Sequence, residues 1–80
     1  MADTQVLAQI QALIDEEHEL RQQEAQGSVS TEQRAKMRAL EEHLDQLWDL
    51  LRQRRARREF GQNPDEAHLR PVETVEHYQQ

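Results

Sequence analysis

The 80-residue chain has no cysteine, and it is poor in the residues that form turns or fill an aromatic core. Without cysteine it can form neither a disulfide nor a metal site with thiolate ligands. Two glycines, two prolines and one residue each of Trp, Tyr and Phe are too few for a many-stranded β fold. The composition favours an all-α fold. A chain this small needs oligomerisation, a metal site of histidines and carboxylates, or very regular helix packing to be stable.

Long hydrophobic runs are also missing. No apolar stretch approaches the roughly 18 residues that a membrane-spanning helix needs. The first five residues lack the basic residues and the apolar core of a signal peptide. We therefore expect a cytoplasmic protein that makes no membrane contact. The net charge of −6 favours solubility and argues against general nucleic-acid binding.

Hydrophobic residues recur at helical spacing along residues 4–26. Steps of three and four place them on one face of an amphipathic helix. They are Val6, Ile10, Leu13 and Leu20. Asp3 or Thr4 is expected to cap this helix, and Gly27 is expected to end it in the left-handed conformation.

A second helix is predicted from about residue 31 to residue 60. Ser30 and Gln33 fit a capping box at its start. Its apolar residues follow the 3-4-3-4 spacing of a coiled-coil seam. They are Met37, Leu40, Leu44, Leu47 and Leu51. The short connection between the helices requires them to be antiparallel neighbours.

The apolar stripes of the two helices match in register. Pairing across the turn aligns Leu13 with Leu44, and Ile10 with Leu47. We therefore predict a coiled-coil-like antiparallel two-helix hairpin over residues 1–60.

An acidic and partly helical tail is expected over residues 61–80. Asn63 and Pro64 are typical of a helix cap and first turn, and this helix is predicted to end at about Leu69. Pro71 is predicted to start another turn or two. The apolar residues on one side of that segment are Val72, Val75 and Tyr78.

Five arginines follow the leucine stripe within seven residues. Arg54 and Arg58 continue the heptad where leucine would be expected, so the core should stop there. The candidate interaction surface consists of Trp48, Arg52, Arg54, Arg55, Arg57, Arg58 and Phe60. We favour neutralisation of the arginines by the helix dipole and by the acidic tail of the same or a neighbouring subunit. Binding of a protein partner or of nucleic acid stays open.

Several apolar residues lie beside the main seam. A two-helix hairpin buries one face of each helix, so these residues would stay exposed in a bare hairpin. They are Leu7, Ile14, Trp48 and Leu50. Either a dimer interface covers them, or the tail does through Leu69, Val72, Val75 and Tyr78. Glu17 interrupts the stripe of the first helix, and we expect it at the edge of the stripe or paired with Arg21 or Arg38.

The sequence contains no signature of catalysis. It lacks a glycine-rich phosphate loop, a nucleophile elbow and a His-Glu-x-x-His motif. Asp15 and His18 have the spacing of di-iron ligands, but only Glu17 among the nearby carboxylates falls on the seam. We therefore expect no catalytic residue, no cofactor and no metal.

Four segments together resemble a family of small bacterial proteins catalogued as domain of unknown function 2630. They are residues 17–21, 40–41, 48–67 and 70–76, so the likeness extends over nearly the whole chain. The resemblance implies a stand-alone bacterial cytoplasmic protein. It implies no activity, cofactor or catalytic residue, because none is assigned to the family.

The favoured hypothesis is a structural or protein-interaction module that self-associates. The hairpin would form a dimer with a four-helix arrangement and would present its arginine-rich end and tail to a protein partner. The alternative is a nucleic-acid-associated protein that uses Arg52–Arg58. A weaker third hypothesis is an enzyme or a metal protein.

Overall fold

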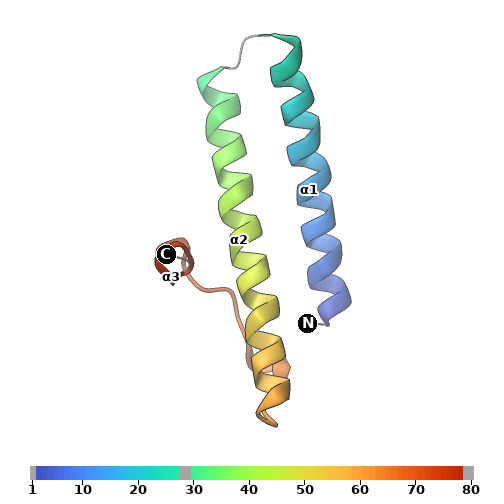
Figure 1. Ribbon diagram of the computed structural model, residues 1–80, viewed down its shortest axis with the longest axis vertical. Helices are drawn as coiled ribbons and strands as arrows, with labels where there is room; N and C mark the ends of the chain where they lie inside the picture. The colour runs from blue at the N-terminus through green and yellow to red at the C-terminus, as the bar shows by residue number, and fades with distance from the viewer. Residues whose placement is uncertain (1, 28–29, 79–80) are drawn as a thin grey trace.

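The computed structural model describes residues 2–27 and 30–78 and consists of two long antiparallel helices with a C-terminal segment folded back on the second (Figure 1). The elements are α1 (Asp3–Gln26), α2 (Thr31–Glu59), the 3-10 turn η1 (Pro64–Glu66) and α3 (Val72–Tyr78). The described residues contain no strand, which confirms the predicted all-α fold. No helix among them is long and apolar enough to cross a membrane.

The ends of α1 differ from the prediction. The cap residue is Ala2, whose backbone N–H donates to the side chain of Gln5 at 2.8 Å. Asp3 is the first helical residue, and its carboxylate binds arginines instead of the helix terminus. Gly27 follows the helix with a φ of 179°, so the predicted left-handed conformation is wrong. Residues 28–29 of the connection lie outside the described part of the chain.

The start of α2 is the predicted capping box. Gln33 donates its backbone N–H to the Ser30 hydroxyl at 3.1 Å, and the Ser30 N–H donates to the Gln33 side chain at 3.0 Å. At the other end the chain turns at Gly61, whose φ of +70° is a conformation that favours glycine. This turn reverses the chain so that the tail runs back along α2.

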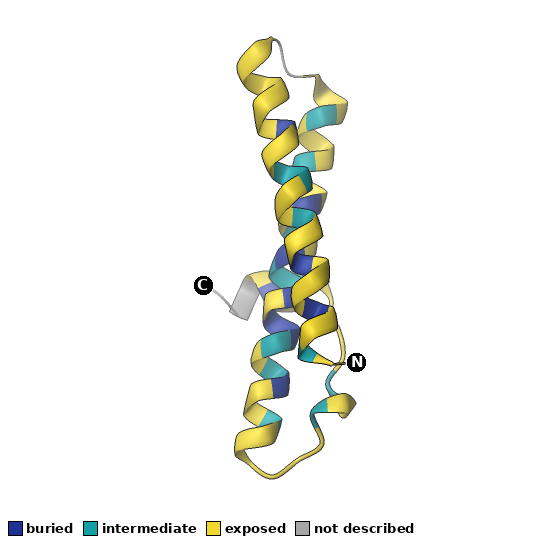
Figure 2. Ribbon diagram, turned by 90° about the vertical axis from the view of Figure 1, so that its right-hand side faces the viewer, coloured by how far each residue is buried: buried dark blue, intermediate teal, exposed yellow. Residues whose placement is uncertain are grey.

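A small hydrophobic core lies between α1 and α2 in the half of the hairpin away from the connection (Figure 2). Its buried residues are Val6, Ile10, Leu44, Leu47 and Leu50. Leu13 and Leu51 pack against this cluster, and Ala67 does so from the tail. The predicted register of the two apolar stripes is therefore confirmed.

The tail is folded as two short elements that both contact α2. Asn63 caps η1 by accepting the backbone N–H of Asp65 at 3.0 Å. This turn ends at Glu66, short of the predicted end at Leu69, because the segment leading to Pro71 is extended. In α3 Val75 is fully buried, whereas the side chain of Tyr78 lies outside the described part.

Candidate interaction surface

The tail covers the outer side of α2 through a polar stripe. Arg70 donates Nε–H to Asp49 Oδ2 at 2.8 Å and a second N–H to Asp49 Oδ1. The Gln53 amide donates to Asp49 at 3.0 Å and to the His68 carbonyl at 2.8 Å, and Gln46 donates to the Arg70 carbonyl at 3.0 Å. These contacts attach the extended segment between η1 and α3 to the second half of α2.

Asp49 is only 1% exposed, so its charge has to be satisfied within the protein. Hydrogen bonds from Arg70 and Gln53 hold the pKa of the Asp49 carboxyl below its usual value, against the opposing effect of burial. The burial and pairing of Asp49 are not predicted by the pattern of apolar residues. The only signal for them is the three-to-four spacing of Gln46, Asp49 and Gln53 along one side of α2.

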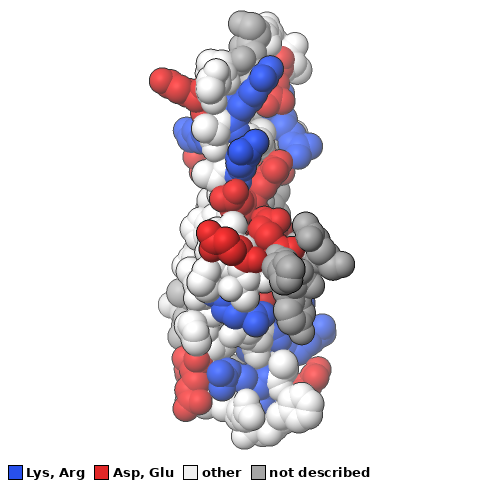
Figure 3. All heavy atoms as spheres, turned by 90° about the vertical axis from the view of Figure 1, so that its left-hand side faces the viewer, with Lys and Arg blue, Asp and Glu red and all other residues white. Residues whose placement is uncertain are grey.

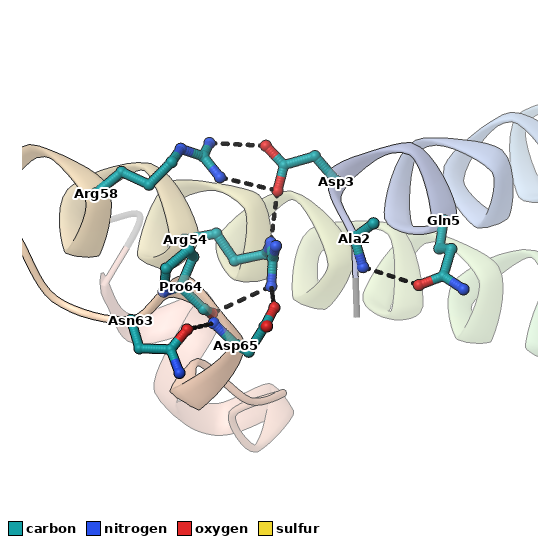
Figure 4. Close-up of polar contacts among 8 residues, drawn as sticks. All are labelled: Ala2, Asp3, Gln5, Arg54, Arg58, Asn63, Pro64 and Asp65. Atoms are coloured by element: carbon teal, nitrogen blue, oxygen red, sulfur yellow. Dashed lines mark hydrogen bonds and ion pairs between the residues drawn. The ribbon is translucent and has the colours of Figure 1, made fainter.

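Arg54 joins three segments of the chain at the open end of the hairpin (Figure 4). Its guanidinium donates to the Asp3 carboxylate of α1, to the Pro64 carbonyl at 3.1 Å and to the Asp65 carboxylate at 3.1 Å. Arg58 makes a bidentate pair with the same Asp3, with distances of 3.1 and 2.7 Å. Arg54 is 5% exposed, so it occupies a buried heptad position as an ion-paired group.

The charges at this junction stabilise one another. Hydrogen bonds from Arg58 and Arg54 lower the pKa of Asp3 to about 2. The bond from Arg54 also lowers the pKa of Asp65, and the bond to Asp3 raises the pKa of Arg54. All three groups therefore remain charged at neutral pH.

The other three arginines are less strongly engaged. Arg57 lies 3.5 Å from Glu66, and Arg52 lies 3.9 Å from Asp49. In the described part of the chain Arg55 forms no ion pair. The N-terminus and the tail thus neutralise Arg54, Arg57 and Arg58, whereas the charges of Arg52 and Arg55 face solvent.

Arg52 and Arg55 lie on the flank of the hairpin opposite Leu50. Consecutive residues of a helix point 100° apart, and antiparallel helices turn in opposite senses when viewed from one end. Leu7 follows Val6 and Trp48 follows Leu47, so both point to the same flank of the pair. Ile14, seven residues after Leu7, and Arg55, seven after Trp48, share that flank. We call it the uncovered face and define it as Leu7, Ile14, Trp48, Arg52 and Arg55.

The uncovered face combines apolar and basic side chains. Leu7, Ile14 and Trp48 are 47%, 39% and 43% exposed. Beside them a shallow hollow opens between the N-terminus of α1 and α2. It is lined by Asp3, Trp48, Leu51, Arg52, Arg55 and Arg58. Phe60, the other aromatic residue of the predicted surface, lies at the end of α2 about 18 Å farther along the helix axis than Trp48.

Leu50 has a different environment from Trp48. It is buried in the hydrophobic cluster, next to the side of α2 that the tail covers. Leu50 is therefore covered within the cluster, against which Ala67 of the tail packs, whereas Leu69, which was expected to provide cover, is 45% exposed. For Leu7, Ile14 and Trp48 the described residues provide no cover.

The outer side of the molecule carries an acidic patch near α3 (Figure 3). Glu76 of α3 lies against Asp45 and Glu42 of α2. Burial, and then the hydrogen bond with Asp45, raises the pKa of Glu76. Among the described residues, no group of three or more histidines and carboxylates is arranged to hold a metal ion.

Glu17 lies at the edge of the α1 stripe, as predicted. Its carboxylate is 3.7 Å from Arg21, and its side chain is partly exposed. Across the helix pair, Arg21 is also 3.9 Å from Glu41 of α2. These pairs lie near the connection, away from the arginine cluster.

Comparison with known proteins confirms the family that the sequence resembles. The model of the family described as "Protein of unknown function (DUF2630)" matches residues 2–80. The uncharacterized protein Rv0898c of Mycobacterium tuberculosis is 48% identical over 77 residues, which cover 95% of this chain and 88% of the relative. The uncharacterized protein Mb0922c of Mycobacterium bovis has the same identity and coverage. No solved structure matches the chain.

Proposed function

The chain belongs to the DUF2630 family of proteins of unknown function, and we propose that it is a self-associating interaction module without enzymatic activity. The hairpin would pair with a second copy through the uncovered face. Two hairpins stacked in this way would form a four-helix arrangement.

The observation that carries the proposal is the unequal cover of the two flanks. On one flank the tail packs against the hairpin, and Leu50 is buried. On the other flank Leu7, Ile14 and Trp48 stay exposed at neighbouring levels of the two helices. A cluster of exposed aromatic and aliphatic side chains with arginines at its border is the usual composition of a protein interface.

A second copy is the occupant that best fits the size of the core. Only five residues form the buried cluster of the described chain, and a core this small supplies limited stability by itself. Disulfides are excluded because the chain has no cysteine. Burial of the uncovered face in a dimer would add the apolar contacts that the isolated hairpin lacks.

The free arginines give weaker support to a nucleic-acid role. Within the described chain, Arg55 of the cluster forms no ion pair and Arg52 makes only a 3.9 Å contact with Asp49, and the net charge is −6. Polyphosphate binding depends on several cationic contacts that release counterions. Retention on DNA or RNA that falls steeply with salt would favour this alternative over the dimer.

The composition of the chain is the basis for the location that we propose. The chain is rich in charge, at 32% Asp, Glu, Lys and Arg, and has no cysteine that depends on the redox state of its compartment. We therefore place the proposed dimer in the cytoplasm.

Sedimentation equilibrium of the wild type and of Trp48→Ala tests the proposal. We expect the wild type to dimerise, and we expect Trp48→Ala to weaken the dimer by about 2 kcal/mol or more, since a buried aromatic anchor dominates such an interface. Leu69→Ala is the matched control, because Leu69 is 45% exposed but lies in the tail. A wild type that stays monomeric at millimolar concentration would exclude self-association.

A further inference from the structure

The charges on the uncovered face are arranged unequally along its length. Arg52 and Arg55 lie toward the open end of the hairpin. Glu41, which is exposed, lies seven residues before Trp48 and therefore on the same face, toward the connection. One end of the face is thus basic, and an acidic group lies nearer the other end.

The apolar residues of the uncovered face are arranged symmetrically about one level of the hairpin. The charged residues Glu41 and Arg52 are symmetric about the same level. Leu7 and Ile14 are equally far from the level midway between Ile10 and Gln11, and Ile10 shares the core cluster with Leu47. Glu41 and Arg52 are equally far from the level just before Leu47. At 1.5 Å per residue each lies about 8 Å from that level along α2. Two independent pairs, one on each helix, therefore share one midpoint.

From this coincidence we infer that two copies pack antiparallel through the uncovered face, with Arg52 of each copy opposite Glu41 of the other. This inference rests on the proposed self-association and adds the orientation of the partner. The two-fold axis crosses the hairpin at the shared midpoint. It places α2 over α2 of the second copy and Leu7 opposite Ile14.

The parallel arrangement is disfavoured by charge. A two-fold axis along the hairpin would place α2 of each copy over α1 of the other and would bring the open ends of both copies together. The basic ends would then lie at one end of the dimer, and Glu41 would lie about 16 Å along the axis from Arg52 of the other copy. Like charges across an interface reduce affinity. The antiparallel arrangement separates the basic ends and gives each Arg52 a second carboxylate, besides Asp49 of its own chain at 3.9 Å.

A charge-exchange experiment tests the orientation. Arg52→Glu places two glutamates opposite each other at both symmetric contacts, and Glu41→Arg does the same with arginines. We expect each variant alone to dimerise about tenfold more weakly than the wild type at low salt, because two exposed ion pairs become two repulsive pairs. An equimolar mixture of the two variants should form heterodimers, in which both symmetric contacts again join opposite charges.

The mixture separates pairing from changes within one chain. Arg52→Glu also disturbs the 3.9 Å contact with Asp49, and Glu41→Arg removes the contact with Arg21, but mixing cannot repair either effect. The matched control is a mixture of Glu19→Arg with Arg38→Glu. These residues are exposed and lie off the uncovered face, so this pair should show no preference for heterodimers.

The possible results distinguish the antiparallel orientation from the proposed self-association on which it rests. Heterodimers that form only in the first mixture support the antiparallel orientation. Variants that dimerise as tightly as a dimeric wild type overturn the orientation and leave self-association standing. A monomeric wild type overturns both.

Discussion

Along its middle the molecule is three layers deep, because α3 lies on the side of α2 away from α1 (Figure 1), whereas near the connection only α1 and α2 face each other. The open half contains the five-residue core cluster, the buried Arg54 and the tail that is attached through Asp49. The half near the connection has Leu20 and Leu40 as its buried apolar residues, within the described chain. Figure 2 shows that burial decreases toward the connection.

The comparison shows how a two-helix hairpin gains a defined core. Near the connection the exposed pairs Lys36–Glu16 and Arg21–Glu41 lie at 3.8 and 3.9 Å, and such pairs contribute little stability. At the open end Ala67 of the tail packs against the core cluster, and Arg70 of the tail pairs with the buried Asp49. The two long helices supply the five buried residues of the cluster, and the tail adds contacts to α2 that make the open half the better packed one.

Truncation of buried leucines should give the largest difference in stability between the two halves. Leu47→Ala should lower the free energy of unfolding by about 2–5 kcal/mol, because Leu47 is almost fully buried in the cluster. Leu20→Ala should cost about 2 kcal/mol or less, because Leu20 lies outside the cluster, where the helices are more exposed. Urea denaturation followed by circular dichroism measures both, and equal losses would contradict the proposed difference between the halves.

Loss of the Arg54 guanidinium should have a smaller and more local effect. Arg54→Gln removes the guanidinium hydrogen bonds to the Asp65 carboxylate and the Pro64 carbonyl, so η1 should be held less firmly against α2. Amide hydrogen exchange should accelerate in residues 62–67, with little change near the connection. Arg55→Gln is the control, because Arg55 forms no ion pair among the described residues, and it should leave exchange unchanged. Faster exchange in Arg55→Gln than in Arg54→Gln would refute the assignment.

The seam could be predicted from sequence, but the polar junctions could not. Apolar spacing and the Ser30 capping box are local patterns, and they determined both helices and their register. The pairs Arg54–Asp3 and Arg70–Asp49 join residues 51 and 21 positions apart, and they depend on the path of the tail. No local pattern specifies that path.

At Arg54 the sequence predicts the end of the apolar core but not the ion pairs that this residue forms. An arginine in a leucine position of the heptad was correctly taken as the end of the apolar core. The same position still faces inward, so the side chain is buried and needs carboxylates from other segments. The sequence offers Asp3 as a candidate helix cap and Asp65 in the first turn after the Asn63 cap, but nothing in it matches either of them to this arginine.

The smallest expected effect is the response of the tail to pH, which should have opposite signs at its two attachments. Deprotonation of Glu76 is disfavoured by burial and by Asp45 and Glu42 of α2, so its pKa is raised above the ordinary 4.5. Stability from this group is present at low pH and lost as pH rises through the raised pKa, so docking of α3 should tighten as neutral solution is acidified. The pKa of Asp65, which attaches η1 to α2, is instead lowered below the ordinary 3.8 by the hydrogen bond from Arg54. Stability from this group is present above about pH 4 and lost as pH falls through the lowered pKa. As the pH is lowered from neutral, amide exchange should show that protection of residues 72–76 rises first and that protection of residues 62–67 then falls.

The control is Glu76→Gln, in which the rise should disappear while the fall stays. A rise that persists in this variant would show that another group controls the docking of α3.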